Sequence, residues 1–421
     1  MVRQLVRRAG LTLLVAACSE HVAAPGVCPQ FCPAGALTVV DTVFLTAISG
    51  DSAYGRPSGY ADPDKSAYLI ASNLAGVRQS RPIFRTSAIA PRVPIGTDTT
   101  TGPVVGVDSL RLALTITRRE PGTRNLSLSL YRLPLTIDST STLAGLAASF
   151  GAAPVRTVNV DSLIARPGRR DPVTKDSVVV DTVNQRTTLI LHLDSAQTPY
   201  VPADTGKLAF GIRVNADTLA TVTIGSVENV GFGPVVSWYL KVDSLGAKVL
   251  HPAPQRRSSG FDSFVFDVPS PALDSTLVVG GVPATRSVLR VAFPRILRDS
   301  TRIIRATLEL LPAVLPTGIA ADSFGVVAHA VVGDFGAKSP LDFTHVDTAR
   351  VRIGPLDTLR IEVADILRYW AADSSRPAVF VLRQVPEGGN FAEIRLFASR
   401  TAASRPRLHV TYAHAFSFAQ P

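Results

Sequence analysis

From Thr38 onward, apolar and polar residues alternate along most of the chain. In residues 107–116, for example, Leu110, Leu112 and Leu114 share one face. A period of two is the pattern of a strand with one buried face. Turns rich in Pro, Gly, Asp and Ser separate these segments, and long helical periods are almost absent. We therefore predict an all-β chain of antiparallel β-sandwiches with a jelly-roll-like arrangement.

The alternating segments form two similar series in the same order. The matching pairs are 66–86 with 274–293, 107–116 with 303–312, 186–195 with 356–365, 207–214 with 377–385, and 220–242 with 392–413. The stretch "HPAPQRRSSG" between the two series is rich in Pro, Ser and charge. This internal repeat predicts two tandem β-sandwich domains at 41–250 and 260–413, a linker at 251–259 and a tail at 414–421.

One short segment of the second series has helical spacing. Val363, Ile366, Leu367 and Trp370 stand at positions i, i+3, i+4 and i+7, which share one face of a helix. Asp365 could cap this helix. We predict a short helix that lies across one open end of the second sandwich. Trp370 then either fills the core or offers an aromatic surface to a ligand.

The first residues have the form of an export signal. Three arginines among the first eight residues precede an apolar stretch at 9–17, which is roughly half of the ~20 residues that cross a bilayer. The sequence "VAAC" then resembles the lipobox of bacterial lipoproteins. The resemblance implies a signal peptide at 1–17, a lipid on Cys18 and a tether at 18–40. Ser19, where some lipoproteins have Asp, implies the outer membrane. The alternative is a signal peptide without lipid.

Two further cysteines lie in "VCPQFCPAG". Cys28 and Cys32 would form a local disulfide in an oxidising compartment or remain free thiols. Two thiols are too few ligands for a structural zinc site, and the spacing is not the redox C-x-x-C.

The formal charge of +10 does not indicate nucleic-acid binding. Only six of the 43 basic residues are lysines, the arginines stand singly or in pairs, and Asp residues interrupt them. A nucleic-acid-binding surface would need a continuous basic stripe or patch.

The second series resembles the DNRLRE or disaggregatase-related β-sandwich domains of surface proteins. The resemblance covers roughly 260–413, with a more divergent version over 41–243. It rests on "TRSVLRVAF", "LRIEVADILRYWAA" and "FASRTAASRPRLHVTYA". Thr401 stands where the family often has Glu. The positions that match the family pattern are Arg290, Leu308, Trp370, Ser399, Arg400, Arg405, Pro406, Leu408 and Tyr412.

The family resemblance implies a jelly-roll-like sandwich, and some relatives bind polysaccharide. Exposed aromatic residues would support such binding. Tyr54 and Tyr60 lie in the polar, Gly-rich stretch "SAYGRPSGYADPDK", where they either contact a ligand or pack within the loop. Trp238 shares its face with Val236 and Leu240, which indicates a core position.

A hydrolase is an alternative. Residues 50–52 read Gly-Asp-Ser after an apolar strand and resemble the nucleophile block of GDSL-type esterases, and Asp342 and His345 match that family's D-x-x-H block. However, the chain has no G-x-N-D block and no β/α alternation, and the two pieces fall in different predicted domains.

The sequence contains no metal-binding motif, and we expect no cofactor. Asp62 and Asp64 could contribute to a calcium site, because Ca²⁺ prefers oxygen ligands in loops; a solvated turn is the alternative. We therefore expect a non-catalytic, lipid-anchored envelope protein whose leading partner is polysaccharide. The alternatives are a structural role in envelope assembly and an esterase that uses Ser52.

Overall fold

The computed structural model describes residues 38–55, 59, 61, 68–74, 78–95, 100–120, 122–183, 186–218, 220–267, 275–299, 301–318 and 323–414. The predictions for the signal peptide, Cys18, Cys28, Cys32, Tyr60, Asp62 and Asp64 lie outside these residues.

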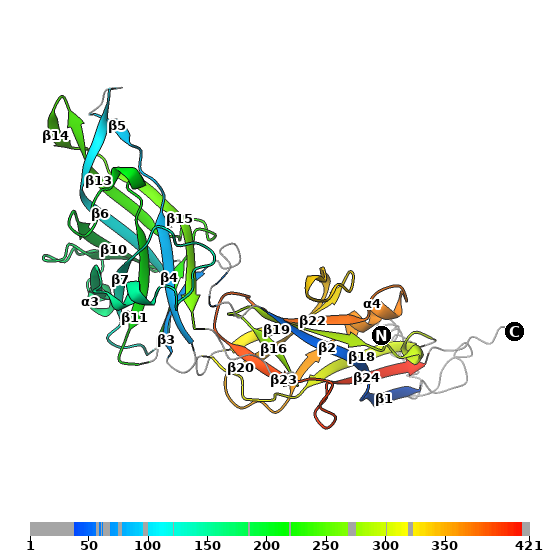
Figure 1. Cartoon of the computed structure of the whole chain (residues 1–421). Coiled ribbons are helices and arrows are strands. Elements are labelled where there is room, and N and C mark those ends of the chain that lie inside the picture. Colours follow the sequence, from blue (N-terminus) through cyan, green and yellow to red (C-terminus); the bar gives the residue numbers. More distant parts are fainter. Residues whose placement is uncertain are drawn as a thin grey trace, which may run out of the picture.

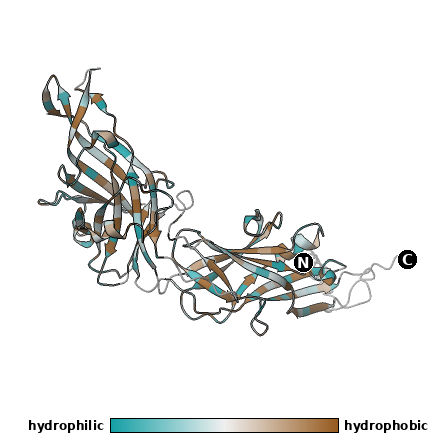
Figure 2. Cartoon of the chain, in the orientation of Figure 1, coloured by the Kyte–Doolittle hydropathy of each residue, from teal (hydrophilic) through white to brown (hydrophobic). Residues whose placement is uncertain are grey.

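The predicted all-β class is confirmed. Strands hold 53% of the described residues and helices 8%, and the strands pair in antiparallel fashion. Figure 2 shows apolar and polar residues alternating along many of the strands. The alternation in sequence therefore becomes one buried and one outward face per strand.

Two groups of strands separate in space (Figure 1). We call the first group the inserted body, because it lies between β2 and β16 of the second. Its elements are β3 (Tyr68–Leu74), β4 (Arg78–Thr86), β5 (Arg92–Pro94), β6 (Thr101–Arg119), β7 (Ser127–Leu133), α2 (Ala147–Gly151), β8 (Arg156–Asn159), α3 (Val160–Ile164), β9 (Ser177–Asp181), β10 (Arg186–Asp194), η3 (Pro202–Asp204), β11 (Ala209–Asn215), β12 (Thr221–Gly225), β13 (Val235–Ser244), β14 (Ala247–Leu250) and β15 (Gln255–Phe266).

We call the second group the terminal body, because it contains both described ends of the chain. Its elements are β1 (Val39–Phe44), β2 (Ile48–Gly55), β16 (Thr276–Gly280), β17 (Thr285–Val291), η4 (Arg295–Leu297), β18 (Thr301–Leu310), β19 (Ser323–Val331), η5 (Gly336–Lys338), β20 (Leu341–Arg352), β21 (Leu359–Glu362), α4 (Ala364–Ala371), β22 (Val379–Val385), β23 (Glu393–Phe397) and β24 (Arg407–His414).

Each body buries an apolar core between its strands. In the terminal body, the sheet β1–β24–β18–β21 and the sheet built on β19, β22 and β17 contribute to one core cluster. In the inserted body, β15 pairs with both β13 and β4, while β12 pairs with both β3 and β6. Because β3 also pairs with β4, and β6 with β13, these strands form a closed ring of pairings around a second core.

The two bodies share one pattern of strand pairing. In the inserted body, β6 lies between β10 and β13, and Leu112 faces Leu191 and Val236. In the terminal body, β18 lies between β21 and β24, and Leu308 faces Ile361 and Leu408. The pairs β4–β11 and β17–β22 correspond in the same way.

The predicted domain boundaries differ from these pairings. Residues 255–259 of the predicted linker begin β15, which pairs with β13 and then β4. Conversely, β1 and β2 pair with β24 and β17. We call residues 39–55 and 255–266 the corner segments, since the first part of each pairs with one strand and the second part with another. The first part of β15 keeps most of its side chains exposed while its backbone is paired, so its polar sequence resembles a linker.

The predicted short helix is present as α4. Val363 stands at its N-cap without a side-chain hydrogen bond, so the prediction that Asp365 caps the helix is wrong. Asp365 lies in the first turn, where a negative charge favours the helix dipole. Trp370 is fully buried, with its ring centre 4.6 Å from that of Phe380.

Candidate functional site

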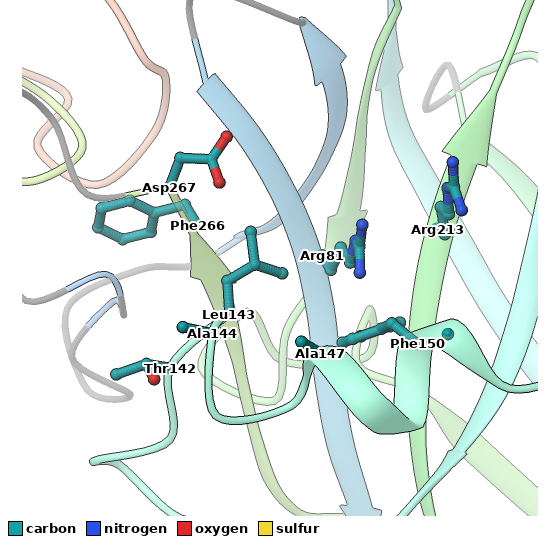
Figure 3. Close-up of a pocket in the computed structure, with 10 residues that line it drawn as sticks. Arg81, Thr142, Leu143, Ala144, Ala147, Phe150, Arg213, Phe266 and Asp267 are labelled. Carbon is teal, nitrogen blue, oxygen red and sulfur yellow. The ribbon is translucent and has the colours of Figure 1, made fainter.

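A pocket of about 540 Å³ opens on the inserted body (Figure 3). Five parts of the fold form it: β4, β11, residues 142–144 before α2, α2 itself, and the end of β15 with the residue that follows it. Figure 3 shows Arg81 and Arg213 near Phe150, with Phe266 and Asp267 across the pocket. The residues that line it are Arg81, Thr142, Leu143, Ala144, Ala147, Phe150, Gly151, Arg213, Phe266 and Asp267.

The local sequence explains why the sheet opens here. The ladder between β4 and β11 ends where Ile83 faces Gly211. The next residue of β4 toward the pocket is Pro82, which has no N–H to donate. Arg81 and Arg213 lie two positions from Ile83 and Gly211, so they project from the same face as those residues.

Phe150 of α2 rests on this face. A Cβ atom built on Gly211 would lie 2.5 Å from Cζ of Phe150, so the glycine permits the close approach of the ring. The guanidinium of Arg81 lies 4.5 Å from the centre of the same ring. This cation–π contact holds the half-buried Arg81 side chain at the pocket.

The pocket is electropositive. Burial lowers the pKa of Arg81, and the nearby charge of Arg213 lowers this pKa further; guanidinium groups nevertheless stay charged at neutral pH. Among the described residues, neither arginine forms an ion pair. Asp267, the one acidic residue of the lining, accepts a hydrogen bond from the backbone N–H of Gln79 at 3.0 Å.

The lining combines charged, hydrogen-bonding and apolar groups. The described lining contains no histidine, cysteine or pair of carboxylates. A nucleophile with its general base, or an acid–base pair, is therefore missing from this set. Two guanidinium groups beside an apolar wall match an organic anion.

Tyr54 lies elsewhere, on β2 of the terminal body. Its hydroxyl accepts a hydrogen bond from Ser52 Oγ at 3.1 Å, and its half-buried ring packs against a cluster that includes Val288 and Val381. Of the two alternatives for Trp370, the core position is confirmed and the ligand contact is wrong, because the side chain is fully buried. The structure therefore does not bring Tyr54 and Trp370 together in one site.

The esterase residues are also kept apart. Ser52 lies on β2 and His345 on β20, with β17, β22 and β19 between them in the sheet. Four strand spacings amount to about 19 Å, which excludes a contact. His345 and Asp342 do interact, with Nδ1 and Oδ2 at 2.8 Å, but the imidazole stacks on Tyr369 with 4.0 Å between ring centres.

The Gly-Asp-Ser motif has a structural role instead. Asp51 accepts a hydrogen bond from the backbone N–H of Ser399. In the inserted body, the related "SGFDS" places Asp262 so that it accepts a hydrogen bond from the N–H of Val227 at 3.1 Å. Ser399 and Val227 follow the corresponding strands β23 and β12. Both aspartates therefore fasten a corner segment to the same point of the repeat.

The sequence interpretation missed the arginine pocket. Arg81 and Arg213 resemble the many other arginines on strands of this chain. The available signal was Pro82 inside a strand pattern, because a proline cannot donate a backbone hydrogen bond to a neighbouring strand.

The described residues contain no group of three potential metal ligands, and no helix among them has the length and apolar character needed to span a membrane. No family model matches this chain, and no curated protein is similar to it in sequence. The resemblances to DNRLRE domains and to lipoproteins therefore stay predictions.

Proposed function

We propose that this chain is a non-catalytic envelope protein, anchored in the outer membrane by a lipid on Cys18, that binds acidic polysaccharide. The pocket at Arg81 and Arg213 carries the proposal, because it presents two cations that have no ion-pair partner among the described residues. The resemblance of the second series to surface sandwich domains supports the assignment to polysaccharide.

The terminal body contains the same pair of arginines. Arg81 lies two positions from Ile83, which faces Gly211, and Arg213 lies two positions beyond Gly211. Arg286 and Arg383 stand in the same relation to Val288 and Val381, which face each other in β17 and β22.

In the terminal body, one carboxylate joins the two arginines. Glu387 accepts two hydrogen bonds from Arg286, both at 2.7 Å, and lies 3.7 Å from Arg383. Paired hydrogen bonds of this kind are among the stronger interactions of a carboxylate. The terminal body thus provides an internal example of how this arginine pair holds a carboxylate.

Among the described residues of the inserted body, no carboxylate joins Arg81 to Arg213 in this way. Asp217 follows Arg213 at the spacing at which Glu387 follows Arg383, but Asp217 accepts a hydrogen bond from the side-chain amide of Asn125. The space beside the arginines is the open pocket. A carboxylate that belongs to the ligand can therefore occupy the position that Glu387 fills in the terminal body.

The remaining lining favours a sugar acid over a multiply charged anion. Asp267 and Thr142 offer oxygen atoms that can accept hydrogen bonds from hydroxyl groups, and Leu143 contributes an apolar wall. The negative charge of Asp267 also opposes a second negative charge on the ligand. A uronic acid unit, with one carboxylate and several hydroxyls, combines these features.

Binding of oligosaccharides tests the proposal. In calorimetric titration, a galacturonate trimer should bind the chain at least about tenfold more tightly than the neutral galactose trimer, the factor expected for one hydrogen-bonded charge pair. Arg213→Gln should remove this preference. The matched control is Arg302→Gln, which changes the same charge at an exposed position of β18.

The outcomes separate the alternatives. If the two trimers bind with equal affinity, both to the wild-type chain and to Arg213→Gln, the protein binds polysaccharide but the pocket is not the binding site. Failure of both trimers to bind would favour the structural role in envelope assembly. The anchor is tested separately, because Cys18→Ala should move the protein from the membrane fraction to the soluble fraction.

A further inference from the structure

Each body is completed by the corner segment that precedes the other series of strands. Residues 39–55 precede β3 in the chain, yet they pair with β24 and β17 of the terminal body. Residues 255–266 precede β16, yet they pair with β13 and β4 of the inserted body. The two repeats have therefore exchanged their first strands within one chain.

The two places that receive these segments are built alike. Ser52 of the first segment faces Val288, and Ser263 of the second faces Ile83, at corresponding positions of β17 and β4. Asp51 accepts a backbone N–H after β23, and Asp262 accepts one after β12. The bonds that hold a corner segment therefore depend on a local sequence motif and not on which copy of the chain supplies it.

The contacts of residues 39–55 join distant parts of the chain. Asp41 accepts a hydrogen bond from Thr411 Oγ1 at 2.7 Å across 370 positions. Asp51 and Ser399 are 348 positions apart. The terminal body therefore cannot complete its sheets until residues 39–55, which are joined to it through the inserted body, pair with it. Closing so long a loop costs entropy.

We propose that residues 39–55 also fill the terminal body of a second copy of this chain, which gives a dimer with exchanged segments. Every strand pair of the single chain is kept in such a dimer, so the exchange costs little free energy. Only the chain that supplies residues 39–55 changes.

Cysteine pairs in the full chain test this proposal. Val43 and His409 face each other in β1 and β24, and both side chains are exposed. With Cys18, Cys28 and Cys32 changed to Ser, the double variant Val43→Cys, His409→Cys is unfolded, refolded at a series of concentrations and oxidised. A covalent dimer should appear on non-reducing gels, and a tenfold higher concentration of monomer should raise the ratio of dimer to monomer about tenfold.

A second pair controls for random oxidation. Arg111 and Ser237 face each other in β6 and β13, which lie in one series of strands. Arg111→Cys, Ser237→Cys should therefore cross-link within one chain at every concentration. The proposal is overturned if the first pair also gives only monomer throughout. Light scattering of the unsubstituted chain after the same refolding must also detect the dimer, and its absence there overturns the proposal even if a cysteine variant misfolds.

Discussion

The inserted and terminal bodies have equivalent strands in equivalent pairs, but they fill their cores differently. In the inserted body, Trp238 of β13 faces Leu110 of β6. At the same point of the terminal body, Val410 faces Ala306. The smaller pair is accompanied by α4, which brings Trp370 into that core. The comparison teaches that the alternation of apolar and polar residues sets the strand framework. The segments between the strands, such as α4, determine which side chains fill the core.

The covering segments show the same principle on the outer face. Arg85 and Arg290 occupy corresponding positions beside Phe261 and Gly50. Arg85 donates hydrogen bonds to the carbonyl groups of Leu135 and Ile137, while Arg290 forms an ion pair with Asp334 at 2.6 Å. Both arginines therefore hold a covering segment, although the two segments differ in sequence and shape.

The largest expected effect comes from cutting the chain at the boundaries that the sequence repeat indicates. A fragment of residues 41–250 lacks β15 and should not fold, because β4 and β13 then expose unpaired edges. A fragment of residues 68–267 contains β3–β15 and should unfold cooperatively in thermal circular dichroism. Cooperative unfolding of the first fragment alone would contradict the exchange of corner segments.

The next largest effect concerns the two tryptophans. Trp370→Ala should lower the free energy of unfolding by about 3–5 kcal/mol, the usual cost of removing a large buried aromatic side chain. Urea denaturation of the full chain measures this change. Trp238→Ala is the matched variant in the inserted body, where Trp238 is equally buried. A loss below about 1 kcal/mol for Trp370→Ala would show that α4 is not part of the core.

A smaller effect depends on pH. Burial, assisted by the charge of Glu228, raises the pKa of Asp262 to about 6 in the folded chain. Between pH 4 and 6 the folded state retains a proton that the unfolded state has lost, so stability falls as pH rises through this window. Between pH 4 and 6, the free energy of unfolding should fall by about 1–3 kcal/mol less in Asp262→Asn than in the unsubstituted chain.

Urea denaturation at pH 4 and pH 6.5 measures the decline. Part of it should persist in Asp262→Asn, because burial and nearby carboxylates also raise the pKa of Asp347 to about 6. An unchanged slope in Asp262→Asn would mean that the carboxyl group is solvated in the folded chain.

The smallest effect tests the motif shared by the corner segments. Asp51→Ala should cost about 1–2 kcal/mol, since the backbone N–H of Ser399 loses its acceptor. Ser52→Ala at the neighbouring position removes only a hydroxyl that bonds to Tyr54 and should cost less. Thermal unfolding of both variants provides the comparison. A greater loss for Ser52→Ala would reverse the assigned roles.

The sequence predicted the class of fold and the repeated order of strands because alternation with a period of two reflects burial directly. It did not predict which body a corner segment completes, because both segments carry the same Ser-Gly and Asp-Ser elements. The arginine pocket was missed for a similar reason. Arg81 and Arg383 look alike in sequence, and only the three-dimensional position of Glu387 distinguishes a closed pair from an open one.

Phe266 connects the pocket to the junction of the two bodies. Its ring lines the pocket and also belongs to an apolar cluster with Val282 and Phe391 of the terminal body, with 6.0 Å between the ring centres of Phe266 and Phe391. A tilt of one body against the other therefore displaces part of the pocket wall. If the pocket binds a ligand as proposed, occupancy of the pocket and the relative orientation of the two bodies should therefore depend on each other.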